Sequence, residues 1–441
     1  MLRTLVLVAL LLAPALAAAQ SPPDLASFLA PLSGYPTLQA AKEKIVSARA
    51  QLHAAYDPVA LQASGGYTAF DNNQVDLDPS KPGVQGLPAS GGQIAAGLTL
   101  RPWLFGDTAD QADRSRIQLQ QAELDYQDAL TGLQIQALQA AYGLQLARES
   151  LASAEQGEQV SQAALAATRV RLAKGAASDR DVRAAESGLK QAQNYVADAR
   201  GSVALAETTL SSLVGSVVAP AVDGVNVDVP SGTPLAVQRA QLSEGLADVS
   251  VRSATRSVYP VVQAGYTWNI DGQDSIGLSI ESRTLQPKVD YAFTSPGRSF
   301  PQDQIRGSFQ IGVSASFSPG VIDGLDATAA QLRAARDGVD AARRGAAVQK
   351  ASLDNDLAQA HRALALATLQ LDDARANLDE DRKRETLGLS TPLATQEAAL
   401  ELTQHQLALQ QARQDVLAKT LAYFRFYALP LVNQPVSEVQ P

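Results

Sequence analysis

The spacing of apolar residues along the chain alternates between two periods. Over residues 94–100, 262–270 and 309–317, apolar residues alternate one by one with small or polar residues. A period of two is typical of strands that have one apolar and one polar face. Long runs rich in alanine and leucine, spaced as in a helix, lie between and after these stretches. The pattern therefore predicts a few strands joined to very long helices.

The helical stretch at residues 107–174 contains no proline and would span roughly 100 Å at 1.5 Å per residue. The helix that follows repeats apolar residues every seven positions, at Val182, Leu189, Val196, Val203 and Leu210. A second track of small residues lies three positions further on, which is the seam of a coiled coil. Residues 357–423 carry tracks of the same kind. Two tracks per helix indicate neighbours on two sides, as in a closed ring of helices.

The same order of elements occurs twice. In each copy a proline separates a helical stretch from a strand, and a second proline separates a later strand from a long helix. These four helix–strand junctions are Pro58, Pro102, Pro260 and Pro319. The unit is about two hundred residues long, so it is a duplicated half and not a short solenoid repeat.

The duplication predicts the division of the chain. The expected parts are a signal peptide (1–19), a first repeat (20–213), a linker (214–234), a second repeat (235–424) and a C-terminal tail (425–441). The first part has Arg3, a short apolar run at residues 5–12 and small residues at 17–19, as a cleavable secretory signal does. An uncleaved membrane anchor is the alternative, which the short run disfavours. No later stretch is apolar for the length of a membrane helix.

Two helical turns carry capping residues. Gly175 is expected at the left-handed position after the first long helix, with Ser178 as the N-cap of the next helix and Asp181 three residues later. In the second copy Gly388 ends a helix, Thr391 caps the next one, and Pro392 stands at its first position. Both turns are predicted to be tight tips of helical hairpins.

The strands suit a transmembrane β-barrel, which is apolar towards lipid and polar towards a wet lumen. A soluble antiparallel sheet with one wet face is the alternative. The second copy poses a problem of parity, because residues 261–270, 275–283 and 305–317 would make three crossings where an even number is needed. We expect residues 275–293 to form an external hairpin or loop, while four crossings remain open. The Asp271-Gly272 step suits a hairpin turn.

Composition excludes several functions. Aromatic residues make up 5% of the chain and net charge is −9, so neither an enzyme-like core nor a basic nucleic-acid surface is expected. Cysteine is absent, which excludes disulfides, thiol catalysis and cysteine–zinc sites. His53, His361 and His405 are isolated in helical stretches without partners for a metal. We therefore expect no cofactor, no metal and no enzymatic activity.

These features resemble the TolC-type family of outer-membrane efflux and secretion channels. The residues that carry the resemblance are Tyr56-Asp57-Pro58, Pro102-Trp103-Leu104-Phe105-Gly106, Arg171-Leu172-Ala173-Lys174-Gly175 with Asp181-Val182 six residues on, Tyr259-Pro260, Pro319-Gly320-Val321-Ile322-Asp323-Gly324 and Gly388. Their duplicated order covers nearly the whole mature chain. The resemblance implies an α+β membrane protein that forms a homotrimer. Four strands per protomer would give a twelve-stranded barrel, continuous with an antiparallel α-helical coiled-coil barrel in the periplasm. The linker and the tail around residues 424–432 would form a collar at mid-tunnel.

The resemblance also assigns roles to the tips. Gly175, Ser178, Asp181, Gly388, Thr391 and Pro392 would dock onto a periplasmic adaptor. The family has a Tyr, an Arg and an acidic residue near the second glycine, where this chain has Glu385, Ser390 and Ala394. Glu397 still fits an acidic residue that faces the pore, where three copies would favour cations. The alternative for Glu397 is an ordinary acid near a helix start, and Asp181 suits a cap better than a gate.

Two functions follow as hypotheses. The first is an outer-membrane duct of a tripartite efflux pump or type I secretion system, which works with an adaptor and an inner-membrane pump or ABC transporter. The second is a non-conducting periplasmic coiled-coil adaptor or an envelope-spanning structural protein. An adaptor would have one helical hairpin flanked by β domains, so the duplicated hairpins favour the duct.

Overall fold

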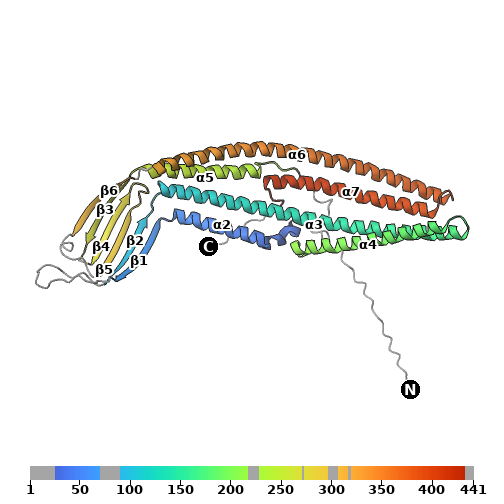
Figure 1. The fold of residues 1–441 in the computed structure, drawn as a ribbon, viewed down its shortest axis with the longest axis horizontal. Helices are drawn as coiled ribbons and strands as arrows, with labels where there is room; N and C mark the ends of the chain where they lie inside the picture. Colours follow the sequence, from blue (N-terminus) through green and yellow to red (C-terminus); the bar gives the residue numbers. More distant parts are fainter. Residues whose placement is uncertain are drawn as a thin grey trace, which may run out of the picture.

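A computed structural model describes residues 25–69, 90–216, 228–270, 273–295, 306–315 and 319–432. One end of the elongated molecule is a β-sheet, and the other end holds the turns of two helical hairpins (Figure 1). The helices are α1 (Leu25–Leu29), a short 3-10 helix η1 (Ala30–Gly34), α2 (Pro36–Tyr56), α3 (Asp107–Ala173), α4 (Asp179–Val214), α5 (Leu235–Val258), α6 (Pro319–Thr386) and α7 (Pro392–Tyr427). The strands are β1 (Val59–Ala69), β2 (Ser90–Leu100), β3 (Val261–Asn269), β4 (Asp274–Glu281), β5 (Lys288–Ser295) and β6 (Gly307–Ser314). The expected signal peptide lies outside the described residues.

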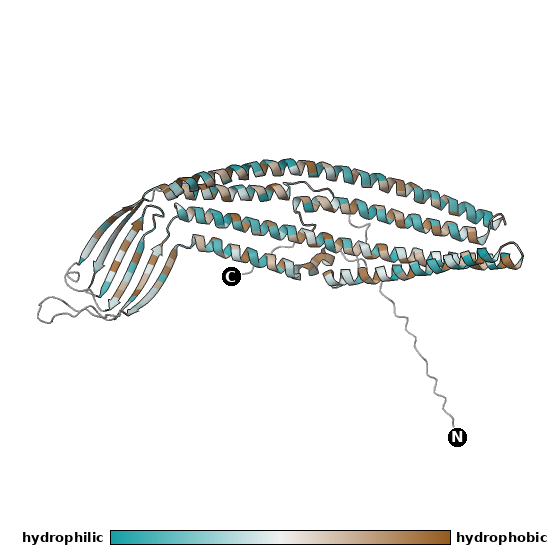
Figure 2. Ribbon diagram, viewed as in Figure 1, coloured by the Kyte–Doolittle hydropathy of each residue, from teal (hydrophilic) through white to brown (hydrophobic). Residues whose placement is uncertain are grey.

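The six strands form one sheet in the order β1-β2-β5-β4-β3-β6, and every neighbouring pair is antiparallel. The register aligns apolar residues across the whole sheet. One such row consists of Leu61, Leu98, Val289, Leu278, Tyr266 and Phe309. The adjacent row points to the other face and consists of Gln62, Gly97, Asp290, Gly277, Thr267 and Ser308. Figure 2 shows the resulting alternation of hydropathy along the strands.

The strand count corrects the sequence-based prediction. Four strands per protomer were expected, with residues 275–293 outside the sheet, but the sheet has six strands. Residues 275–293 do form a hairpin, β4–β5, and this hairpin lies inside the sheet between β2 and β3. The second repeat therefore contributes four strands, which restores an even number of crossings. The Asp271-Gly272 step lies outside the described residues.

Two helices run from the sheet to the far end of the molecule. They are α3, with 67 residues, and α6, with 68 residues. Beside α3, α2 covers the half nearer the sheet and α4 the half nearer the tip; α5 and α7 divide the length of α6 in the same way (Figure 1). Each repeat thus has one uninterrupted helix and one pair of shorter helices placed end to end.

The buried core lies where these shorter helices meet. In the first repeat, Leu210 and Leu213 of α4 pack with Leu29, Leu32 and other residues of α1, η1, α2 and α3. In the second repeat, Val237 of α5 packs with Tyr423, Phe426 and Tyr427 at the end of α7. The rings of Phe426 and Tyr427 meet edge to face with centroids 4.8 Å apart. Each joint is thus filled by apolar side chains.

The C-terminal tail packs against the middle of α3. The fully buried side chain of Gln134 accepts a hydrogen bond from the backbone N–H of Leu431 (2.7 Å) and donates one to the carbonyl of Val432 (2.8 Å). Helix α7 runs three residues past the predicted end of the second repeat, to Tyr427. The tail beyond Val432 and linker residues 217–227 lie outside the described residues.

None of the helices in the described part of the chain has the length and hydropathy that a membrane-spanning helix requires.

Candidate functional site

The first tip turn joins α3 to α4. Gly175 has a φ of 71°, and the backbone N–H groups of Gly175 and Ala176 donate to the carbonyls of Leu172 and Arg171. These two bonds form a Schellman motif, which satisfies carbonyls at the end of α3. Next, the Oγ of Ser178 accepts from the Asp181 N–H (3.3 Å), and the Asp181 carboxylate accepts from the Ser178 N–H (2.8 Å). The N-cap predicted at Ser178 is therefore confirmed, and the reciprocal bonds with Asp181 complete a capping box.

The same hydrogen bonds change the acidity of Asp181. Bonds from the Ser178 backbone N–H and then its hydroxyl lower the pKa of the Asp181 carboxyl below its usual value. Asp181 is exposed on α4 and makes its bonds within its own turn. The geometry matches the cap that the sequence favours for Asp181.

The second tip turn joins α6 to α7 and has the same construction. Gly388 has a φ of 72°, and the N–H groups of Gly388 and Leu389 donate to the carbonyls of Glu385 and Arg384. The Oγ1 of Thr391 accepts from the Ala394 N–H at 3.3 Å, and Pro392 is the first residue of α7. Both turns lie at the end opposite the sheet (Figure 1).

The side chains near the second tip differ in exposure. Glu397 is exposed on α7 and forms no ion pair with any residue that the structure describes. Ala394, Glu385 and Ser390 are half-buried. Within the described ranges, neither Glu385 nor Ser390 makes a side-chain hydrogen bond to the α3–α4 hairpin. Leu387 and Leu389 are exposed at the turn itself. The second tip therefore presents an acidic residue and two leucines.

The four prolines lie where the sequence predicts changes of structure. Pro58 separates α2 from β1, and Pro260 separates α5 from β3. Pro102 follows β2, and Pro319 is the first residue of α6. Proline suits these positions because it disfavours a helical conformation in the preceding residue and can begin a helix without an N–H.

The junction between sheet and helices contains charged residues that the sequence analysis missed. Arg256 of α5 donates to the Gly106 carbonyl (2.6 Å) and to the buried carboxylate of Asp110 in α3. Arg252 pairs with Asp113 at 2.8 Å, and Arg283 in the β4–β5 turn lies 3.6 Å from Asp107. These six side chains, three arginines and three aspartates, connect both repeats and the hairpin. The i,i+3 spacing of the aspartates at the start of a helix was the available signal.

Gly106 fits tightly between α3 and the β4–β5 turn. Its φ is 61°, and a Cβ at this position would lie 1.9 Å from the carbonyl oxygen of Arg283. Leu100 of β2 also donates its N–H to the carbonyl of Pro287 at 2.9 Å. The hairpin is therefore fixed to the junction by backbone contacts.

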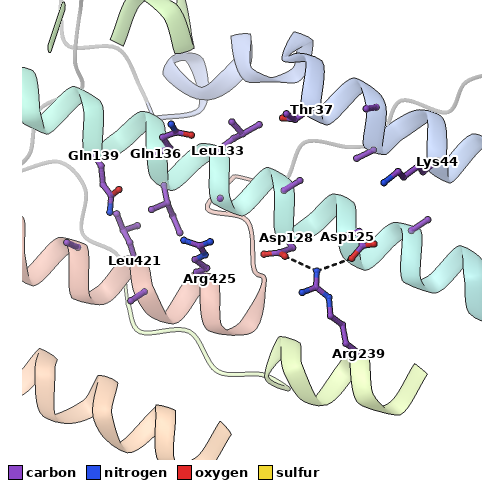
Figure 3. A pocket seen from close by; sticks show the side chains of 18 residues that line it. Thr37, Lys44, Asp125, Asp128, Leu133, Gln136, Gln139, Arg239, Leu421 and Arg425 are labelled. Carbon is purple, nitrogen blue, oxygen red and sulfur yellow. Dashed lines mark hydrogen bonds and ion pairs between the residues drawn. The ribbon is translucent and has the colours of Figure 1, made fainter. Parts of the chain in front are cut away.

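A second link between the repeats lies at mid-molecule. Arg239 of α5 donates to Asp125 and Asp128 of α3 at 2.9 Å each, beside a pocket of ≈ 760 Å³ that α2, α3 and α7 also line (Figure 3). The Arg239 guanidinium forms ion pairs with both carboxylates and so joins α5 to α3. No group of three or more potential metal ligands lies among the described residues.

The chain is similar to known proteins both in sequence and in fold. Residues 32–216 match the family described as outer membrane efflux protein. A membrane protein from Pseudomonas aeruginosa is 18% identical, with a TM-score of 0.66 over 92% of this chain and 91% of that one. Two further solved structures have the same fold. The outer membrane protein VceC from Vibrio cholerae is 16% identical, with a TM-score of 0.63 over 92% of this chain and 96% of that one. The open-state MtrE outer membrane channel from Neisseria gonorrhoeae is 16% identical, with a TM-score of 0.64 over 92% of this chain and 89% of that one. No curated protein matches the chain.

The chain thus has the fold of outer-membrane channels, with a β domain at one end of a long helical domain. Residues 32–216 match the outer membrane efflux protein family, which confirms the resemblance that the sequence indicates. The family and these channels are non-enzymatic, in agreement with a sequence that has no catalytic constellation.

Proposed function

We propose that the chain is the outer-membrane channel-tunnel of a tripartite efflux pump or type I secretion system. In this role it conducts substrates passively from the periplasm, or from an inner-membrane pump, to the outside. The observation that carries the proposal is the two-faced sheet continuous with helices of about 100 Å. Such a molecule can place one end in a membrane and the other deep in the periplasm.

The apolar face of the sheet supports membrane insertion. Large side chains on this face are exposed in the protomer, among them Leu61 (78%), Tyr67 (74%) and Phe309 (67%). A soluble protein rarely exposes a continuous apolar face of this kind. Contact with outer-membrane lipid would cover it, while the polar face would line a wet lumen.

The edges of the protomer support a homotrimer. The sheet ends at β1 and β6, whose outer backbone groups need partners. Because β1 and β6 run antiparallel within the sheet, the β6 of one protomer can pair with the β1 of the next in the same antiparallel way. Exposed apolar residues of α4 and α6, such as Leu205, Val348 and Leu369, would be covered by the same closure. Three copies would close a ring, as in the family that the chain resembles.

The tips are the proposed docking surface for a periplasmic adaptor and its inner-membrane pump or ABC transporter. Gly175, Ser178, Asp181, Gly388, Thr391 and Pro392 build the two turns, and exposed Leu387 and Leu389 add apolar contact area. Removal of residues 1–19 by signal peptidase is part of the proposal, because the protein must cross the inner membrane first.

The test is fractionation of cells that express the full chain, followed by conductance of the purified protein in planar bilayers. An outer-membrane trimer that conducts ions is expected. A product that stays soluble in the periplasm and forms no channels would instead favour the second candidate, a non-conducting coiled-coil adaptor or structural protein.

A further inference from the structure

The β4–β5 hairpin has no counterpart in the first repeat. Strands β1 and β2 of the first repeat correspond to β3 and β6 of the second, because each pair is joined directly by hydrogen bonds and connects two helices. Removal of β4 and β5 would leave the order β1-β2-β3-β6, with β2 and β3 still antiparallel. The hairpin is therefore an insertion that widens the sheet without changing the direction of any other strand.

The inserted hairpin is an integral part of the sheet. Val289 and Leu278 continue the apolar row between Leu98 and Tyr266, and Asp290 and Gly277 continue the polar row between Gly97 and Thr267. Its turn packs on Gly106 and pairs with Asp107. A loop outside the sheet would not need strands in register with β2 and β3, nor a turn that packs against Gly106.

The hairpin also carries the charge of the sheet. All four charged residues in the described strands, Asp274, Glu281, Lys288 and Asp290, belong to β4 and β5. The alternation puts Glu281, Lys288 and Asp290 on the polar face, and Asp274 on the other. Two carboxylates and one ammonium leave this face with one net negative charge per protomer.

On the polar face, glycine residues of the neighbouring strands flank an ion pair. The Nζ of Lys288 is 2.9 Å from the Oδ1 of Asp290. A Cβ on Gly97 of the neighbouring strand would lie 2.7 Å from the same oxygen, and Gly277 borders Asp290 on the other side. Without a side chain at residue 97, the carboxylate can lie across the next strand.

We propose that the β4–β5 hairpin enlarges the outer-membrane pore to an eighteen-stranded barrel and that its Glu281, Lys288 and Asp290 set the ion selectivity of that pore. The proposal rests on the proposed function, because six strands from each protomer make eighteen only in a closed trimer. Barrel diameter grows roughly in proportion to the number of strands, so the pore is about one and a half times as wide as one with twelve strands. Rings of charged side chains in such a lumen select ions by sign.

The placement of the hairpin is tested by cysteine labelling, since the chain has no native cysteine. Single variants Asp290→Cys and Val289→Cys probe the two faces of β5, and Thr267→Cys and Tyr266→Cys probe the matching rows of β3. The full protein in lipid vesicles is treated with a membrane-impermeant maleimide. Labelling is expected at 290 and 267 and protection at 289 and 266. Equal labelling at 289 and 290 beside alternation at 266 and 267 would overturn the inference and leave the channel intact. Loss of alternation at 266 and 267 would count against the proposed barrel itself.

The charge assignment is tested by reversal potentials of single channels in a salt gradient. Lys288→Gln is expected to shift the reversal potential towards that of a more cation-selective pore, and Asp290→Asn and Glu281→Gln are expected to shift it the opposite way. Asp274→Asn is the matched control, because Asp274 belongs to the same hairpin but to the apolar face, and no shift is expected. Shifts of one sign for all variants, or no shift at Lys288 and Asp290 in a conducting channel, would contradict the assignment.

Discussion

At the scale of the residue, two buried polar side chains of α3 have opposite energetic roles. Gln134 satisfies two backbone groups of the tail, whereas the hydroxyl of Tyr142 is buried without a partner among the described residues. A satisfied buried group stabilises the fold, and an unsatisfied one costs free energy. Substitutions at these two residues should therefore change stability in different directions.

Replacing Gln134 with alanine should release the C-terminal tail. The change leaves the N–H of Leu431 and the carbonyl of Val432 without their partner, at a cost of about 1–3 kcal/mol for each group that stays buried. Thermal unfolding and proteolysis of the tail would show the loss. Gln136→Ala is the control, because Gln136 is exposed on the same helix. Equal effects of both variants would mean that the bonds of Gln134 contribute nothing specific.

Replacing Tyr142 with phenylalanine should leave the stability unchanged or raise it. Burial raises the pKa of the Tyr142 hydroxyl to about 12, so the unfolded chain loses this proton first as pH rises above 10. Stability is therefore lost between pH 10 and pH 12, and the variant should lose less of it over that range. Denaturation at pH 7 and pH 11 measures both effects.

In contrast, Tyr423→Phe should destabilise the folded protein, because the Tyr423 hydroxyl donates a hydrogen bond to Asp354 at 2.6 Å.

At the scale of the element, turns and junctions connect the long helices. The tip turns depend on local hydrogen bonds, whereas the junction at Gly106 depends on contacts with the distant residue Arg283. The two kinds of connection should respond differently to pH and to substitution.

The α3–α4 turn should loosen in acid. The pKa of Asp181 is lowered in the fold, so its contribution to stability is present above the unfolded value and is lost as pH falls through the folded value. Hydrogen exchange at the amides of the turn should therefore show less protection at pH 3 than at pH 6. Asp181→Asn should remove this pH dependence, while Asp179→Asn should retain it. Identical profiles for both variants would refute the role of the capping box.

Gly106→Ala should strongly destabilise the junction. A methyl group would collide with the Arg283 carbonyl, and the positive φ adds backbone strain of about 1–3 kcal/mol. Gly132→Ala in the middle of α3 meets nothing within 4 Å and should be neutral or stabilising by up to about 1 kcal/mol. Thermal unfolding of the two variants in detergent compares them directly. Similar midpoints would mean that the hairpin turn can move away from α3 without cost.

Sequence patterns predicted the elements whose signals are local. Gly175, Ser178 and Thr391 act within a few residues of their own turns, and the predicted caps are confirmed. The strand count was wrong because it depends on pairing between β2 and β5, which are far apart in sequence. Residues 276–280 alternate as a strand does, but the parity of the crossings and the resemblance favoured a hairpin outside the sheet. The pair of Asp110 and Arg256 was missed for the same reason, since 146 positions separate its members.

At the scale of the whole molecule, charged residues lie at both ends. The described strands carry their charge on the inserted hairpin, and the tips carry an exposed Glu397. In a trimer both would form rings, one in the membrane and one at the periplasmic end.

Glu397→Gln tests whether the tip ring takes part in selectivity. If Glu397 faces the pore, the variant should be less cation-selective in bilayers and less sensitive to block by divalent cations. If Glu397 only interacts with the start of α7, ion selectivity should be unchanged and thermal stability slightly lower. Selectivity and thermal unfolding measured on the same preparation distinguish the two roles.

The division of each repeat into one uninterrupted helix and one interrupted pair has a mechanical consequence. A displacement at the tips can reach the sheet through the continuous backbone of α3 and α6, because hydrogen bonds of a helix resist stretching along its axis. The pairs α2 with α4 and α5 with α7 are interrupted between their helices, and apolar side chains fill these joints. We therefore expect the proposed trimer to bend at the level of these joints, half-way along its length, and to twist there when the tips rotate.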